Sequence, residues 1–271
     1  MQFHVVIPAR YDSERLPAKP LAMIAGKPLV QHTYERAIAS GAIDVTVATD
    51  DERIAEACRA FGADAMLTSA THASGTDRIA EVAAKCGWRP DEIVVNLQGD
   101  EPLMSPPLIA AAAQKLAAVE SAGIATLATP ITDRREFENP NAVKVVCDAE
   151  GHALYFSRAP IPFERSAGSD SPLPAGEGPG VRVREVEHAK MKSNPAAGAL
   201  RHIGLYAYRV ETLKTLTQTP PCRLELAERL EQLRALWLGI HIAVETVDPA
   251  PPAGVDTAAD LARVEAAMAN L

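Results

Sequence analysis

Aromatic residues are scarce in this chain of 271 residues, and long apolar runs are missing. Phe, Trp and Tyr together make up 4% of the sequence, and no apolar stretch approaches the ~18 residues that cross a membrane. The N-terminus lacks a basic segment followed by a long apolar one, so we expect neither a signal peptide nor a membrane partner. With 47% hydrophobic and 23% charged residues, the composition is typical of a globular protein.

Cysteine and positive charge are scarce as well. The formal net charge is −8, which excludes a broad nucleic-acid surface and requires any cationic site to be local. Neither GxGxxG nor GxxxxGK[ST] occurs, so these two phosphate-binding loops are excluded. The cysteines lie far apart without a CxxC pair, which argues against a zinc site or disulfide framework and favours a reducing cytoplasm. They are Cys58, Cys86, Cys147 and Cys222.

Apolar strands alternate with amphipathic helices in the first half of the chain. Residues 3–7 and 45–49 have the pattern of buried strands, and residues 29–40 between them have helical spacing. Repeated strand–helix–strand units predict an α/β fold with a mainly parallel, doubly wound sheet covered by helices on both faces. Further predicted elements are helices that end at Gly62 and Gly87, a helix capped by Ser105, and a strand at 124–129.

The pattern changes after residue 130. Residues 142–148 and 152–158 are β-like runs separated by a short turn, which predicts a hairpin. Residues 224–239 predict one amphipathic helix, and residues 256–271 predict a helix with Asp256 or Thr257 as its N-cap. The apolar stripe of the first of these helices is Leu226, Leu230, Leu233 and Trp237.

A segment of low hydrophobicity follows this hairpin. Residues 166–180 contain ten Gly, Pro or Ser in fifteen positions. So little apolar surface cannot offset the entropy cost of ordering, and we predict a flexible insertion at about 166–195.

Three cations follow the first strand in the stretch IPARYDSERLPAKPL. Arg10, Arg15 and Lys19 stand at the carboxyl edge of the predicted sheet, where open α/β sheets bind ligands. Guanidinium and ammonium groups match phosphate oxygens, so this loop can clamp a triphosphate. On its own, the stretch is more simply interpreted as a solvated basic loop.

Two aspartates stand after other strands. Asp100 follows the strand IVVNLQ, and Asp256 precedes the last helix. A carboxylate beside a triphosphate is a natural Mg²⁺ ligand, although a turn or cap role is an equally simple reading of Asp100 and a strong one for Asp256. If the two lie close together, they and the basic loop supply the parts for phosphoryl or nucleotidyl transfer.

Eight motifs in this order resemble those of the 3-deoxy-D-manno-octulosonate (Kdo) cytidylyltransferases, or CMP-Kdo synthetases. They are VVIPARYDSERLPAKPL, SGTDR, VNLQGDEP, NPNAVKVV, LYFSRAPIP, RHIGLYAYR, LEQLRALWLG and GVDT. The resemblance covers the chain outside the region 166–195. It implies a Mg²⁺-dependent homodimer that transfers CMP from CTP to Kdo and releases pyrophosphate, which activates Kdo for lipopolysaccharide biosynthesis.

The resemblance also implies a division of labour along a single domain, 1–271. It implies a nucleotide-diphospho-sugar-transferase-like fold, with a nucleotide-binding part at 1–130. A smaller β-rich part at 131–220 would bind sugar and form the dimer, and 221–271 would return to the main sheet.

By the same resemblance, each motif contributes site residues. Arg10, Arg15 and Lys19 would meet the CTP phosphates, with Arg10, Lys19 and Asp100 as the catalytic set. Asp100 and Asp256 would hold Mg²⁺. The nucleotide and sugar would be surrounded by Ser74, Gly75, Arg78 and Gln98, and the keto acid would be oriented by Gln98, Arg158, His202, Tyr206, Glu231 and Gln232.

Without the resemblance, these sugar-side residues have simpler structural readings, such as an ion pair for Arg158 or a structural histidine at 202. Two other functions stay open at this point. One is a cytidylyltransferase for another acidic keto sugar, such as a sialic acid. The other is a non-catalytic CTP-binding sensor on the same fold.

Overall fold

The computed structural model describes residues 1–12, 15–163 and 198–269. Nine strands of these residues form one sheet, and a short antiparallel pair, β2 (Met23–Ile24) and β3 (Lys27–Pro28), lies apart from it. Across the sheet the order is β11 (His241–Thr246), β7 (Ala122–Pro130), β10 (Leu200–Arg209), β6 (Ile93–Asn96), β1 (His4–Ala9), β4 (Asp44–Thr49) and β5 (Asp64–Leu67). The hairpin strands β8 (Lys144–Cys147) and β9 (Ala153–Ser157) extend the sheet beside β10.

Along the order from β11 to β5, four of the six neighbouring pairs of strands run in parallel. β1 pairs in parallel with β4 and β6, β4 with β5, and β7 with β11. β10 is antiparallel to both β6 and β7. The predicted α/β class with a mainly parallel sheet is therefore confirmed, and β10 is the strand that joins its two parallel halves.

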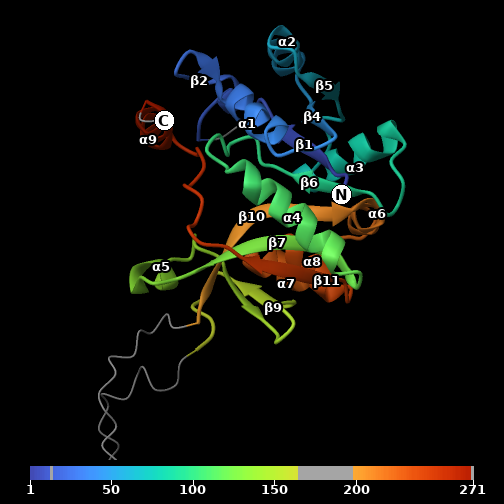
Figure 1. Cartoon of the computed structure of the whole chain (residues 1–271), viewed down its shortest axis with the longest axis vertical. Coiled ribbons are helices and arrows are strands. Elements are labelled where there is room, and N and C mark those ends of the chain that lie inside the picture. Colours follow the sequence, from blue (N-terminus) through green and yellow to red (C-terminus); the bar gives the residue numbers. More distant parts are fainter. Residues whose placement is uncertain (13–14, 164–197, 270–271) are drawn as a thin grey trace, which may run out of the picture.

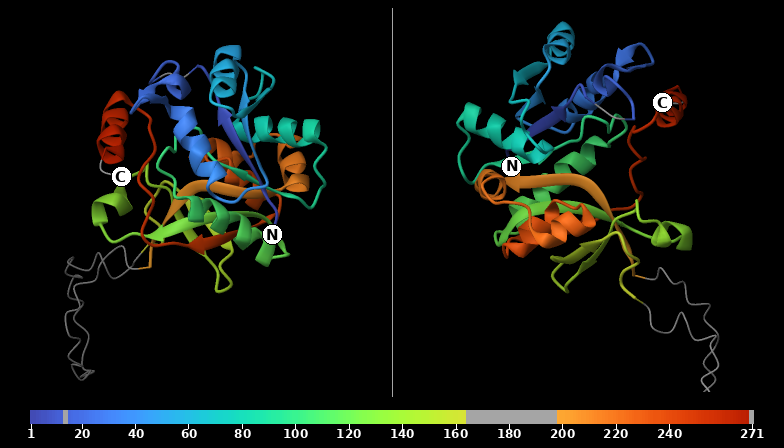
Figure 2. Two further views of the ribbon diagram at one scale, coloured as in Figure 1. Left: turned by 45° about the horizontal axis from the view of Figure 1, so that its top comes forward. Right: turned by 180° about the vertical axis from the view of Figure 1, so that it is seen from behind.

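Helices cover both faces of this sheet, as Figure 2 shows. Alternate side chains of β1 point to opposite faces. Val5 and Ile7 belong to a buried cluster with α1, α2 and α4, whereas Val6 belongs to a cluster with α3, α6 and α8. The helices are α1 (Leu29–Ile38), α2 (Glu52–Ala60), α3 (Gly75–Cys86), α4 (Pro106–Ala118), α5 (Arg134–Glu138), α6 (Val210–Thr217), α7 (Arg223–Glu228), α8 (Gln232–Trp237) and α9 (Ala258–Met268).

Several predicted helix ends are confirmed. Gly62 and Gly87 follow α2 and α3 with φ of 82° and 68°, a left-handed conformation that glycine adopts without steric cost. Ser105 is the N-cap of α4, but its side chain makes no capping hydrogen bond. The predicted hairpin is also confirmed, because β8 and β9 pair antiparallel.

The single helix predicted over 224–239 is wrong. The chain breaks at Arg229, whose φ is 53°, and forms α7 and α8 instead. The break lets Arg234 of α8 turn back onto Glu225 of α7, where Nε donates to Oε2 at 2.8 Å in a buried ion pair. The break also disrupts the apolar stripe, so that Leu226 and Trp237 are 65% and 52% exposed.

The predicted insertion at 166–195 lies outside the described residues. Within the described ranges, no helix has the length and apolar character needed to cross a membrane.

The C-terminal segment runs from β11 at one edge of the sheet to α9 on the other side of the molecule (Figure 1). There Val255 and Val264 form a small buried cluster with Ile24 and Leu29. The last helix is thereby packed against the β2–β3 pair and α1, next to the loop that follows β1. This packing brings residues from the end of the chain to the basic loop near its beginning.

Candidate active site

Lys19 is the centre of a cluster built from three distant segments. It begins a short 3-10 helix, Lys19–Leu21, after the loop that follows β1. Its Nζ donates to Asp100 Oδ2 at 2.6 Å, to Asp256 Oδ1 at 3.2 Å and to the Val255 carbonyl at 3.0 Å. The two aspartates therefore lie close together, and the end of β6, the basic loop and the segment before α9 meet at one ammonium group.

Asp256 is available for this cluster because it does not cap α9. The N-cap is Thr257, which forms a reciprocal capping box with Asp260. The sequence left Asp256 and Thr257 as alternative N-caps, and Thr257 is the one found in the structure. The Asp256 carboxylate accepts from Lys19 and also pairs with Arg15 Nη2 at 3.0 Å.

A cavity of about 250 Å³ lies beside Lys19, between the ends of β1 and β6 and the start of α3. A Cβ at Gly99 would stand 2.9 Å from the Pro8 carbonyl oxygen, so only glycine permits this approach of the two strand ends. The lining residues are Pro8, Ala9, Arg10, Asp12, Lys19, Pro20, Leu29, Gly75, Gln98, Gly99 and Asp100. The structure thus brings together Arg10, Lys19, Gly75, Gln98 and Asp100, as the resemblance implies.

Burial and charge act in opposite directions on Lys19. Desolvation lowers the pKa of its ammonium group, but the carboxylates of Asp100 and Asp256 outweigh this and leave the pKa above its usual value. Lys19 is therefore cationic at neutral pH, as a phosphate-binding group has to be.

Arg78 lies elsewhere. Its side chain is fully buried and does not line the cavity. The guanidinium donates to Asp50 Oδ2 at 2.7 Å and to Thr68 Oγ1 at 2.5 Å, which ties α3 to the ends of β4 and β5. The resemblance implies a nucleotide contact, but in this structure the contacts of Arg78 are structural ones.

His202 and Tyr206 form a second group of candidate residues on β10, with ring centroids 5.2 Å apart. His202 Nε2 lies 2.9 Å from Thr126 Oγ1, whose single proton is donated to a carbonyl of β10. Nε2–H is therefore the donor, and Nδ1 is left as an acceptor. Burial, with a smaller contribution from the charge of Arg201, lowers the pKa of His202 to about 3, so the ring is neutral.

Glu231 joins this second group of residues to the start of α3. Ser74 is the N-cap of α3, and its Oγ donates to Glu231 Oε1 at 3.2 Å. Burial raises the pKa of Glu231, although bonds from Thr76 and Ser74 and the charge of Arg234 oppose it. Gln232 follows as the buried first residue of α8. The elements that carry these residues adjoin those that line the cavity.

Arg158 stands at the end of β9, where backbone carbonyls hold it. Its Nε donates to the Glu228 carbonyl at 2.8 Å and its Nη1 to the Pro140 carbonyl at 3.0 Å. Beneath it, the fully buried Lys144 donates to the carbonyl of Arg158 itself at 2.7 Å. Among the described residues, Arg158 does not form the surface ion pair that was its simpler interpretation.

Known proteins resemble this chain over nearly its whole length. A family model described as cytidylyltransferase matches residues 4–242. The chain is 51% identical over 265 residues, 98% of each chain, to the 3-deoxy-manno-octulosonate cytidylyltransferase of Thioalkalivibrio sulfidiphilus. It is 52% identical to the protein of that name from Marinobacter nauticus, over 99% of this chain and 97% of the relative. The chain belongs to the 3-deoxy-manno-octulosonate cytidylyltransferase family.

Solved structures support the same assignment. A CMP:2-keto-3-deoxy-manno-octonic acid synthetase complexed with CTP superposes with a TM-score of 0.83 at 41% identity, covering 100% of this chain and 99% of that one. A cytidylyltransferase from Leptospira borgpetersenii has a TM-score of 0.61 at 14% identity, over 100% of this chain and 88% of that one, and this likeness shows the fold alone.

In this Kdo cytidylyltransferase-family chain, sequence reasoning missed Glu101. Its half-buried side chain follows Asp100, and a Cβ at Gly254 would approach its Oε1 to 3.0 Å. Burial, and then the charges of Asp100 and Asp256, raise its pKa to about 8. The only signal in the sequence was the acidic pair in GDEP, because burial of the second acid depends on how Gly254 packs.

Proposed function

We propose that this protein transfers CMP from CTP to Kdo and releases pyrophosphate. The observation that carries the proposal is the meeting of Lys19, Asp100 and Asp256 beside a cavity lined by Arg10 and Gln98. Binding of CTP alone does not require two carboxylates at the phosphate site, which favours catalysis over a sensor. Membership of the Kdo cytidylyltransferase family favours Kdo over other acidic keto sugars.

In the proposed reaction, the anomeric hydroxyl oxygen at C2 of Kdo attacks the α-phosphorus of CTP. A new phosphorus–oxygen bond forms, the bond to the β-phosphate oxygen breaks, and the hydroxyl proton is released. Arg10, Arg15 and Lys19 neutralise the charge that develops on the leaving pyrophosphate. Charges held in position before the reaction lower the barrier more than charges that must reorganise.

The acidic pair fits Mg²⁺. Two carboxylate oxygens, from Asp100 and Asp256, already converge on one cation, Lys19 Nζ, at 2.6 and 3.2 Å. Mg²⁺ takes few protein carboxylates and completes its coordination with water and substrate phosphate oxygens. Because no group of three or more His, Cys, Asp or Glu side chains suited to a metal occurs among the described residues, the protein would supply only these two carboxylates. Asp100 and Asp256 would hold the ion, which when bound supplies positive charge at the α-phosphate.

We assign the acceptor sugar to the group formed by His202, Tyr206 and Glu231. His202 is neutral and keeps Nδ1 as an acceptor, so it can receive a hydrogen bond from a sugar hydroxyl. Tyr206 keeps its phenolic proton, because burial raises its pKa well above the usual value. Glu231, Gln232 and Gln98 add further polar groups, and Arg158 supplies positive charge for the carboxylate of the keto acid.

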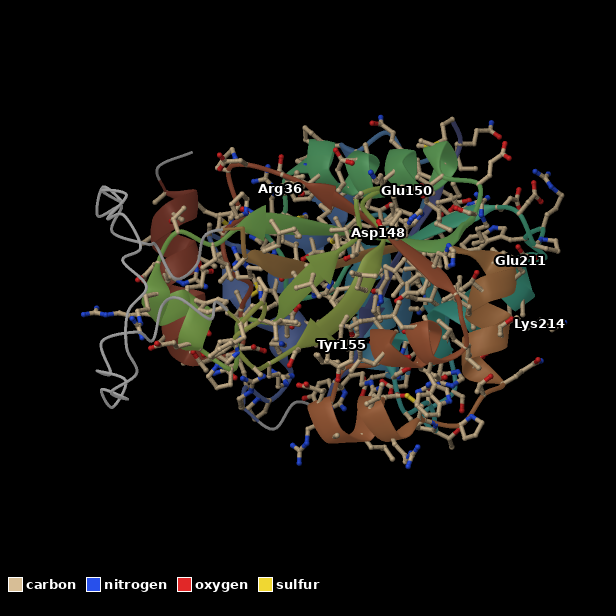
Figure 3. The ribbon with its side chains drawn as sticks, turned by 90° about the horizontal axis from the view of Figure 1, so that it is seen from below. Arg36, Asp148, Glu150, Tyr155, Glu211 and Lys214 are labelled. Atoms are coloured by element: carbon tan, nitrogen blue, oxygen red, sulfur yellow. The ribbon has the colours of Figure 1, made fainter. Side chains whose placement is uncertain are left out.

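We also assign this protein to the cytoplasm as a homodimer. The four cysteines are free, and two of them are buried, as suits a reducing compartment. For the dimer contact we assign the outer surface of α7 and α8, where Leu226 and Trp237 are each more than half exposed. Figure 3 views the molecule from below, with Tyr155 of β9 beside these two helices. Large exposed apolar side chains on two adjoining helices favour an interaction surface.

The test is pyrophosphate release from the purified protein with CTP and Kdo, with and without Mg²⁺. We expect release only when all three are present. Saturable CTP binding without release would favour the sensor, and release with a sialic acid but not with Kdo would move the assignment to another acidic keto sugar.

A further inference from the structure

The loop between β5 and α3, residues 69–74, is fastened at one carboxylate. Glu81 of α3 accepts a hydrogen bond from the Ser69 backbone N–H at 2.9 Å, and its Oε2 lies 2.5 Å from His72 Nε2. Its other oxygen pairs with Lys85 Nζ at 2.7 Å. A single side chain therefore contacts both the beginning and the middle of the loop.

This contact is strong and largely shielded from solvent. The side chains of His72 and Glu81 are 22% and 23% exposed. Burial acts to raise the pKa of Glu81, but the bonds from Lys85, Ser69 and His72 outweigh it and lower the pKa to about 2. Glu81 is thus ionised at neutral pH. Hydrogen bonds to an ionised group are roughly twice as strong as those between neutral groups.

The same loop ends at residues that face both candidate substrate sites. Ser74 donates to Glu231 on the acceptor side, whereas Gly75 lines the cavity beside Lys19. There is little freedom at this point, because a Cβ at Gly75 would stand 3.3 Å from Pro8 Cγ. A loop that is free to shift at His72 would change the position of Ser74 and Gly75 together.

We propose that His72 and Glu81 are positioning residues, which hold the 69–74 loop so that Ser74 and Gly75 are placed for the acceptor and the nucleotide. This inference rests on the proposed function, since it assigns the two ends of the loop to those substrates. Neither residue lines the cavity beside Lys19. A displacement of about 1 Å in a positioning element can lower a rate about a hundredfold.

The test compares two variants at position 72. In H72Q the amide nitrogen can still donate to Glu81, whereas H72L removes the donor and keeps a similar volume. We expect H72L to lower kcat/KM for both CTP and Kdo about tenfold or more, and H72Q to restore it to within about threefold of the wild type. Amide hydrogen exchange of residues 69–76 should be faster in H72L than in H72Q.

A control lies on the preceding helix of the chain, α2, across the sheet from α3. Glu52 and Arg59 of α2 form an ion pair at 2.6 Å in which both side chains are about half exposed. E52Q should leave the kinetics and the exchange of the loop unchanged.

Equal kcat/KM in H72L, H72Q and the wild type would overturn the inference, even if the melting temperature fell. E81L should lower kcat/KM as much as H72L does. The double variant should lose no more kcat/KM than the more impaired of the two single variants, because the two residues act as one unit. Additive losses would also overturn it. Failure of the proposed function is distinguishable, since the wild type would then release no pyrophosphate from CTP and Kdo while loop exchange still responded to H72L.

Discussion

Asp100 and Asp256 accept hydrogen bonds from the same ammonium group, that of Lys19, at 2.6 and 3.2 Å. One follows the end of β6 and the other precedes α9. Their carboxylates would repel each other without a cation between them. This relationship makes the charge at position 100 and at position 256 the first targets for experiment.

D100N should abolish turnover, with a loss of about a hundredfold or more, because it removes half of the anionic pair that fits Mg²⁺. The fold should be unchanged, since asparagine has nearly the same shape. Pyrophosphate release and circular dichroism check the two parts. D91N, at an exposed ion pair with Arg89, is the control, and near-normal turnover of D100N would contradict the metal assignment.

Adjacent residues before α9 should separate stability from activity. T257A removes the N-cap and should cost about 1 kcal/mol of unfolding free energy while most of the activity is kept. D256N should lower the rate steeply and leave the free energy of unfolding nearly unchanged. Urea denaturation and Mg²⁺-dependent kinetics of the two variants measure this, and the reverse result would make Asp256 the structural residue.

His202 should make folding stability depend on pH. Its pKa is about 3 in the folded protein and about 6.5 in an unfolded chain. A group with a lowered folded pKa stabilises the protein above its unfolded pKa, and this stability is lost as the pH falls from about 6.5 towards 3. In H202Q the urea midpoint should therefore decrease less steeply between pH 7 and pH 4 than in the wild type. Parallel curves would mean that the ring is not desolvated.

The hydrogen bonds of Lys144 should affect both the free energy of unfolding and the KM for Kdo. Its buried Nζ donates to the carbonyls of Asn139 and Arg158, and K144M leaves both acceptors without that donor. We expect a loss of about 2 to 3 kcal/mol of unfolding free energy. KM should rise more for Kdo than for CTP, because the carbonyl that loses its donor belongs to Arg158. An equal effect on both substrates would show that Lys144 serves the fold alone.

The exposed surface of α7 and α8 should control assembly. W237E places a charge on the proposed dimer contact and should shift the protein towards monomer in sedimentation velocity. I38K is the control, because Ile38 of α1 is similarly exposed (53%) but lies on another part of the molecule. A wild-type protein that sediments as a monomer, or equal dissociation of both variants, would contradict this face as the interface.

Local patterns were sufficient for most elements of this fold. Local signals suffice here: the continuous apolar run of β1, the proline before α1 and the glycines after α2 and α3. Each acts through a few neighbouring residues, so it can be identified without the rest of the chain. The break at Arg229 could not be identified in this way, because a continuous helix and a broken one have the same apolar periodicity. The difference lies in the contact between Arg234 and Glu225, which forms only in the folded chain.

The candidate site follows the same division. The amino-acid sequence by itself determined which charged residues stand at strand ends, and its motifs determined the family. Only the tertiary structure decided that Thr257 caps α9 and leaves Asp256 for Lys19, that Arg78 turns away into the core, and that Glu81 holds His72. The physical reason is that hydrogen bonds and ion pairs between distant segments depend on which side chains packing brings within about 3 Å, and no short stretch of sequence contains that distance.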